Sequence, residues 1–128
     1  MQHSKEFEAL VDEARPRVRE VTADEVAARQ KDAGSRRQAS GGFRLIDVRE
    51  DDEWRASHAR GAEHLGKGVI ERDIVQKVPD KNEELILYCG GGYRSVLAAD
   101  ALQKMGYRRV FSMVGGFKAW SSKGYPVE

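Results

Sequence analysis

Cysteine is almost absent from this sequence. Cys89 is the single cysteine among 128 residues. One thiol cannot form an intrachain disulfide, and it excludes a metal site built from several thiolates. His3 and His64 show no metal-ligand spacing either, so we expect no metal and no cofactor. Any reaction of the thiol therefore proceeds without a second cysteine of the same chain.

An excess of charge of one sign is also missing, as are long apolar runs. The 22 basic residues are balanced by 21 acidic ones, which leaves a net charge of +1. Nucleic acid or an anionic membrane needs a strongly basic face, so neither partner is expected. No apolar stretch approaches the roughly 18 residues of a spanning helix, and the first residues lack a signal-peptide pattern. The sequence therefore predicts a cytoplasmic protein with a local binding site.

Short apolar segments alternate with helical periodicity along most of the chain. Apolar stretches typical of strands occupy residues 18–21, 45–48, 62–65, 85–88 and 110–114. Helical spacing over residues 69–78 and 96–105 ends at Pro79 and Gly106. Strands separated by helices pair in parallel, so we predict one α/β domain with a mostly parallel sheet of about five strands and helices on both faces. Ligands bind such sheets at the carboxyl ends of the strands.

The first residues predict a helix that stands outside this alternation. Four apolar residues recur at helical spacing before Pro16, namely Phe7, Leu10, Val11 and Ala14. We therefore divide the chain into a helical extension, residues 1–17, and a domain, residues 18–128.

Two local patterns organise the next part of the chain. Thr22 and Glu25 have the spacing of a capping box, which indicates that a helix begins there. Residues 31–42 lack periodicity and are rich in glycine, serine and charge, so they predict an exposed loop.

The cysteine stands at a chemically distinctive position. It directly follows the apolar stretch 85–88 and is itself followed by Gly90, Gly91, Gly92, Tyr93, Arg94 and Ser95. Successive glycines allow the backbone N–H groups to point inward, and the following helix adds positive potential at its N-terminus. With the charge of Arg94, these features favour a thiolate over a thiol. A lone cysteine at a strand end is more often a small buried hydrophobe, but a core position needs no such loop. We therefore predict that Cys89 is a nucleophile.

At this point the chain resembles the rhodanese family, over about residues 18–127. Four motifs in the order of the family carry the resemblance: Ile46-Asp47-Val48-Arg49 with Glu53-Trp54, Ser57-His58-Ala59-Arg60-Gly61-Ala62, Cys89 to Ser95, and Val114-Gly115-Gly116-Phe117-Lys118-Ala119-Trp120. The second motif departs from the family pattern, because Ser57, Ala59 and Arg60 replace its usual Gly, Ile and Pro.

The resemblance implies the rhodanese-like fold and a two-step transfer of sulfur. Cys89 would take the outer sulfur of thiosulfate or a similar persulfide donor, and an external thiol or cyanide would then remove it. The loop residues Gly90 to Ser95 would supply backbone amides, with Arg94 holding an anionic donor.

Two alternatives remain open. The fold can serve as a persulfide carrier or a binding module that does not turn over thiosulfate. Phosphatases of the related fold have Cys-x5-Arg, whereas Cys89 to Arg94 is the narrower Cys-x4-Arg, and no residue of the loop supplies a general acid.

The remaining motif residues have less direct roles. Asp47 and Arg49 lie close to the expected site and are candidates for a supporting layer behind the reactive loop. We interpret His58 as a residue that fixes a turn through its ring nitrogens rather than as a general base. Trp120, with Phe117, is expected in the core.

Overall fold

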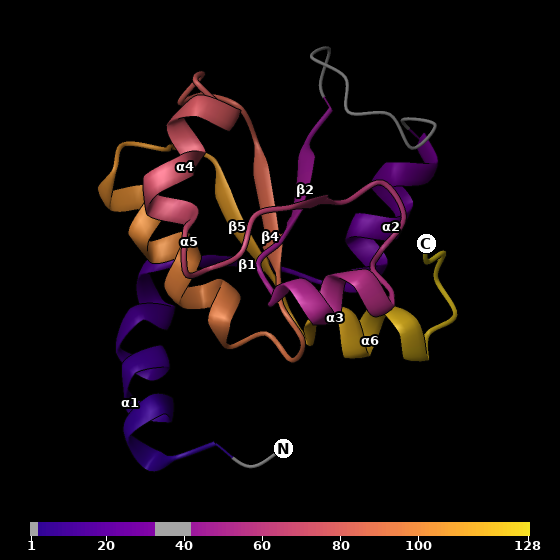
Figure 1. The fold of residues 1–128 in the computed structure, drawn as a ribbon, viewed down its shortest axis with the longest axis horizontal. Helices are drawn as coiled ribbons and strands as arrows, with labels where there is room; N and C mark the ends of the chain where they lie inside the picture. Colours follow the sequence, from indigo (N-terminus) through magenta and orange to yellow (C-terminus); the bar gives the residue numbers. More distant parts are fainter. Residues whose placement is uncertain (1–2, 33–41) are drawn as a thin grey trace.

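A five-stranded parallel sheet forms the centre of the molecule (Figure 1). The computed structural model describes residues 3–32 and 42–128. The strand order is β1-β5-β4-β2-β3, and each neighbouring pair is parallel. The strands are β1 (Arg19–Val21), β2 (Arg44–Asp47), β3 (Glu63–His64), β4 (Leu85–Tyr88) and β5 (Val110–Met113). The predicted α/β fold with a parallel sheet is confirmed.

Helices cover both faces of this sheet (Figure 1). One face carries α4 and α5, with α1 packed against α5, and the other carries α2 and α6. The short helix α3 lies beside α6 in Figure 1. The helices are α1 (Lys5–Ala14), α2 (Ala23–Asp32), α3 (Asp51–Ala56), α4 (Ile70–Lys77), α5 (Arg94–Lys104) and α6 (Gly116–Ser122), and a 3-10 turn (Arg15–Arg17) follows α1.

The central strand β4 shows why the sheet needs helices on both sides. Its four residues are completely buried. Leu85 and Leu87 belong to the core under α4 and α5, whereas Ile86 and Tyr88 belong to the core under α2 and α6. This division follows from the two-residue repeat of a strand, which sends successive side chains to opposite faces. Cys89, the next residue, joins the core on the α5 side.

The predicted capping box begins α2. The Thr22 hydroxyl accepts from the Glu25 N–H at 3.0 Å, and the Glu25 carboxylate accepts from the Thr22 N–H at 2.8 Å. The helix extends through Lys31 and Asp32, so the predicted loop starts two residues too early. The rest of that prediction, residues 33–41, lies outside the described residues.

Two helices were not predicted from the sequence. The helix α3 is only six residues long and buries none of them, so it has no apolar periodicity to detect. Its acidic first turn and a capping box between Glu50 and Glu53 stabilise its start instead. The helix α6 begins at Gly116, directly after Gly115. Both glycines have positive φ, and glycine is a poor helix former.

The first helix is anchored to the body of the protein. Val11 and Ala14 are buried against the α5 side of the core. After the helix, the Arg17 guanidinium donates to both carboxylate oxygens of Asp100 on α5, at 2.9 and 3.0 Å. Arg17 holds the pKa of the Asp100 carboxyl below its usual range, although burial opposes this shift. The position of α1 is therefore set by both packing and charge.

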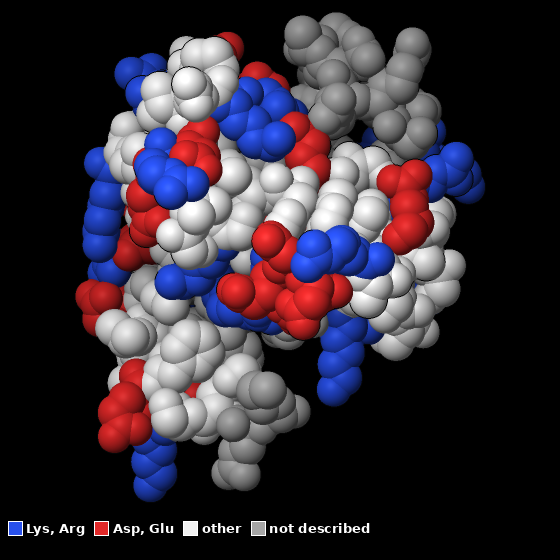
Figure 2. Space-filling model, in the orientation of Figure 1, with Lys and Arg blue, Asp and Glu red and all other residues white. Residues whose placement is uncertain are grey.

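Charges of both signs are spread over the visible surface, and acidic side chains gather over α3 (Figure 2). None of the described helices has the length and apolar character needed to cross a membrane.

If α1 is part of the cooperative fold, Val11→Ala lowers the free energy of unfolding by about 1–3 kcal/mol, because it removes buried methyl groups. Leu10→Ala on the same helix is the matched control, since Leu10 is 59% exposed and its loss costs less than about 0.5 kcal/mol. Urea unfolding measures both values. Equal effects of the two substitutions would contradict the packing of α1 described here.

Candidate functional site

Cys89 lies at the carboxyl end of the central strand, where β4 passes into the N-terminus of α5. The residue is 1% exposed. It is the one cysteine of the chain, and its thiol is free. The sulfur therefore lies at the edge of the sheet where parallel folds bind their ligands.

The loop after Cys89 surrounds the sulfur with hydrogen-bond donors. The backbone N–H groups of Gly92 and Ser95 donate to Sγ, with N···S distances of 3.1 and 3.4 Å. The Ser95 hydroxyl lies 3.6 Å from Sγ and 2.8 Å from the Ser112 hydroxyl on β5. Donors in these positions stabilise negative charge on the sulfur. The loop thus places two backbone N–H donors and one hydroxyl group around Sγ.

The first turn of α6 holds this loop in place. The N–H groups of Phe117 and Lys118 donate to the carbonyl oxygens of Cys89 and Gly90, at 2.7 and 3.0 Å. Gly116 permits the contact, because a Cβ atom there would lie 2.2 Å from the Cys89 carbonyl oxygen and its φ is +54°. A side chain at this position would push α6 away from the loop.

Arg94, the predicted anion-binding residue, is paired with a carboxylate. Its guanidinium donates to both oxygens of Glu53 on α3, at 2.8 and 3.2 Å. This pairing and, to a smaller degree, the nearby Cys89 sulfur raise the pKa of Arg94, although burial opposes the shift. The same ion pair holds the pKa of the Glu53 carboxyl below its usual range. The positive charge beside the sulfur is therefore largely compensated.

A pocket of about 440 Å³ opens over the sulfur. Its lining combines the loop after Cys89, α3 and the N-terminal segment. It consists of His3, Phe7, Glu53, Cys89, Gly91, Tyr93 and Arg94. The sequence identified the loop residues of this set, but it did not predict His3, Phe7 or Glu53 as pocket residues. Glu53 carried a local signal, because it stands three residues after Glu50 in a capping pattern. No sequence pattern pointed to His3 or Phe7 as pocket residues.

Comparison with known proteins identifies the family of the chain. The rhodanese-like domain family matches residues 22–123. The chain belongs to this family.

Two relatives show how rhodanese-like domains are used. Thiosulfate sulfurtransferase GlpE of Haemophilus influenzae is 32% identical over 84 residues, which are 66% of this chain and 78% of that protein. YrkF of Bacillus subtilis, named for a sulfur-carrier role, is 32% identical over 79 residues, or 62% of this chain. The aligned region is only 42% of YrkF, so the chain matches less than half of that relative.

A solved structure resembles the whole chain, including α1. RPA3614 of Rhodopseudomonas palustris has a TM-score of 0.78 and 27% identity, with coverage of 100% of this chain and 98% of that one. It is described as a protein of unknown function and a possible tyrosine phosphatase.

Asp47 and Arg49 of the rhodanese-like domain form a buried ion pair at the end of β2. The Arg49 guanidinium donates to both carboxylate oxygens of Asp47 and to the Ser57 carbonyl oxygen. It also stacks over Phe117, 4.3 Å from the ring centroid. The pair thus joins the end of β2 to the turn after α3 and to α6. Neither side chain lines the Cys89 pocket.

His58 is part of an aromatic stack rather than of the pocket. Its ring lies parallel to Trp54, with 3.4 Å between the ring centroids, and its Nδ1 lies 3.0 Å from the Trp54 carbonyl oxygen. Its backbone pairs with that of Glu128 through two hydrogen bonds. These contacts support a role in fixing the turn and the C-terminal segment. Trp120 is fully buried as predicted, whereas Phe117 is only partly buried.

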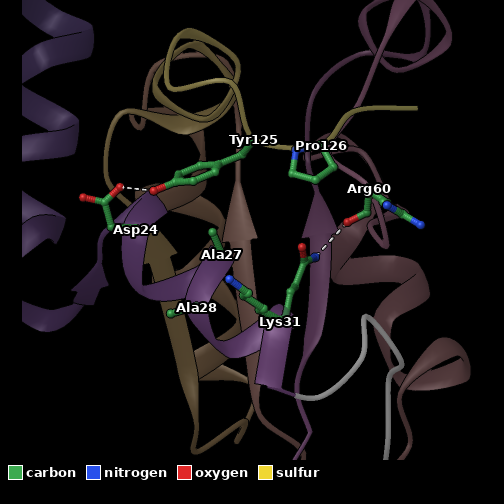
Figure 3. A pocket seen from close by; sticks show the side chains of 8 residues that line it. Asp24, Ala27, Ala28, Lys31, Arg60, Tyr125 and Pro126 are labelled. Carbon is green, nitrogen blue, oxygen red and sulfur yellow. Dashed lines mark hydrogen bonds between the residues drawn. The ribbon is translucent and has the colours of Figure 1, made fainter.

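A second, larger pocket of about 620 Å³ lies between α2 and the C-terminal segment (Figure 3). Three of its polar side chains, those of Asp24, Gln30 and Tyr125, are engaged with other protein groups. Asp24 accepts hydrogen bonds from Tyr125 and Lys123, and Gln30 donates to the Arg60 carbonyl oxygen at 2.7 Å. Cys89, the one cysteine of the chain, does not line this pocket.

The described residues contain no group of three or more His, Cys, Asp or Glu side chains arranged to hold a metal ion.

His58→Ala tests the structural role of the aromatic stack. We expect it to lower the free energy of unfolding by about 1–2 kcal/mol through loss of the Trp54 contact. The rate at which iodoacetamide alkylates Cys89 should stay within about twofold of the original, because His58 is not a pocket residue. Urea unfolding and intact mass follow the two quantities. Loss of sulfur transfer in a fully stable variant would overturn this role.

Proposed function

We propose that this rhodanese-like domain is a sulfurtransferase that carries a sulfane sulfur as a persulfide on Cys89. The observation that carries the proposal is the position of Sγ, which accepts two backbone N–H bonds at the floor of an open pocket. The match to thiosulfate sulfurtransferases supports thiosulfate or a similar compound as the donor and a thiol as the acceptor.

The first step forms the persulfide. The Cys89 thiolate attacks the outer sulfur of thiosulfate, the bond between its two sulfurs breaks, and sulfite leaves with the electron pair. Within the described chain, the backbone N–H groups of Gly91, Tyr93 and Arg94 donate to no protein acceptor. These donors are therefore available to a bound donor anion or to the outer sulfur of the persulfide.

The second step restores the enzyme. A thiolate from outside the chain attacks the outer sulfur, and the Cys89 thiolate is released. The acceptor must be external, because the chain has no second cysteine to complete the reaction.

A phosphatase role is less well supported by the site. Arg94 is bound to Glu53 instead of pointing freely into the loop, and the narrow loop suits one sulfur better than a phosphoryl group. We expect that the protein does not hydrolyse an aryl phosphate. Hydrolysis that is lost in Cys89→Ser would support the phosphatase alternative.

Incubation with thiosulfate tests the persulfide directly. We expect the intact mass to increase by one sulfur atom, sulfite to appear in the same amount, and cyanide or dithiothreitol to reverse the change. Cys89→Ser should fold normally and show neither change, because an alcohol is a far weaker nucleophile than a thiolate. Absence of both signals in the original protein would remove thiosulfate as the donor and favour a dedicated persulfide carrier.

The Arg94–Glu53 pair leads to a prediction about anionic donors. Glu53→Gln removes the carboxylate charge and keeps an oxygen that can accept the Glu50 N–H. We expect kcat/KM for thiosulfate to rise by about threefold to tenfold, because Arg94 then attracts the anion without competition. Steady-state formation of thiocyanate from cyanide measures the change.

Asp52→Asn is the matched control, since it removes the same charge from an exposed position on α3. An equal rise in both variants would indicate general attraction of the anion. A loss of activity in Glu53→Gln would show that the carboxylate itself is required.

A further inference from the structure

The outer wall of the Cys89 pocket comes from a part of the chain that the family match does not include. His3 and Phe7 line the pocket, whereas the rhodanese-like domain family matches residues 22–123. The N-terminal segment therefore contributes directly to the space in which a sulfur compound meets the cysteine.

This wall is held firmly in place. Val11 and Ala14 anchor α1 in the core, and Arg17 is paired with Asp100 on α5. Arg15, just after the helix, lies over the Tyr93 ring at 5.9 Å from its centroid. The residues that line the pocket thus belong to an ordered helix and the segment just before it.

The wall is aromatic. The His3 and Tyr93 rings have their centroids 4.4 Å apart, and Phe7 lies 5.1 Å from His3 and 6.1 Å from Tyr93. In the same pocket, the charge of Arg94 is compensated by Glu53. The pocket therefore offers an apolar, nearly neutral surface beside the sulfur, and its volume of about 440 Å³ lies in the range of small organic ligands.

We propose that His3, Phe7 and Tyr93 select an organic acceptor thiol whose carbon chain ends in an apolar, preferably aromatic, group. This inference rests on the proposed sulfur transfer. The organic group packs against the three rings while its thiolate attacks the outer sulfur of the Cys89 persulfide. A new sulfur–sulfur bond forms, the bond to Sγ breaks, and the products are an organic persulfide and the Cys89 thiolate. No external oxidant or reductant is needed.

Two thiosulfonate reagents test the wall without any need for sulfur transfer. Benzyl and methyl methanethiosulfonate both attach their RS group to a thiolate and release methanesulfinate. Because the chain has one cysteine, the intact mass reports labelling at Cys89 alone. We compare the rates at which the benzyl and methyl reagents label the folded protein. Dividing this benzyl-to-methyl ratio by the ratio measured in urea-unfolded protein corrects for the intrinsic reactivity of the reagents.

The corrected ratio should favour the benzyl reagent by about tenfold in the folded protein, as aromatic contacts of this kind allow. We expect Phe7→Ala and His3→Ala each to reduce the preference by about threefold or more. His3 precedes α1, so its substitution tests the wall even if Phe7→Ala loosens the helix. Leu10→Ala, on the exposed side of the same helix, should leave the ratio unchanged.

A second measurement tests the acceptor itself. Protein loaded with persulfide is mixed with phenylethanethiol or mercaptoethanol, and the loss of the extra sulfur is followed by mass. Faster discharge by phenylethanethiol, reduced in His3→Ala and Phe7→Ala, is the expected result.

Each other outcome has a distinct meaning. A corrected ratio near one, or one that is insensitive to His3 and Phe7, overturns the proposal even if the persulfide forms. If the benzyl reagent is preferred but phenylethanethiol does not discharge the persulfide faster than mercaptoethanol, the acceptor assignment is overturned. If no donor loads Cys89, the acceptor proposal fails together with the proposed function, and a retained benzyl preference shows that the function rather than the wall was wrong.

Discussion

The hydrogen bonds between the first turn of α6 and the cysteine loop are the constraint on which the site depends. Two N–H groups of α6 donate to the carbonyl oxygens of Cys89 and Gly90. The approach is so close that Gly116 leaves no room for a side chain. This contact turns the carbonyls of the loop toward α6, while the N–H groups of Gly92 and Ser95 reach the sulfur. The first turn of α6 thereby shapes the loop that begins at Cys89.

Charge around the sulfur is balanced rather than strongly positive. Backbone N–H groups donate to the Cys89 sulfur, whereas the charge of Arg94 is matched by Glu53. Backbone dipoles act over a short range and do not attract every anion in solution. In the proposed function, this arrangement and the aromatic wall from the N-terminal segment make selectivity depend on the contacts of the bound molecule with the pocket.

The sequence predicted what depends on local pattern and left out what depends on distant contacts. The buried run 85–88 and the capping box at Thr22 are readable because their physics acts within a few residues. The short helices α3 and α6 were missed, since caps and contacts with the loop stabilise them more than periodicity does. His3 lies 86 positions before Cys89 in the sequence, and only the packing of α1 on α5 brings it to the pocket.

The most direct test of the central claim is a crystal structure of the protein after exposure to thiosulfate. The account predicts a second sulfur bonded to Sγ of Cys89, within hydrogen-bond distance of backbone N–H groups of the loop and open to the pocket at Phe7 and Tyr93. An unmodified sulfur, with thiosulfate bound elsewhere or absent, would contradict the claim that this loop holds a persulfide formed from thiosulfate.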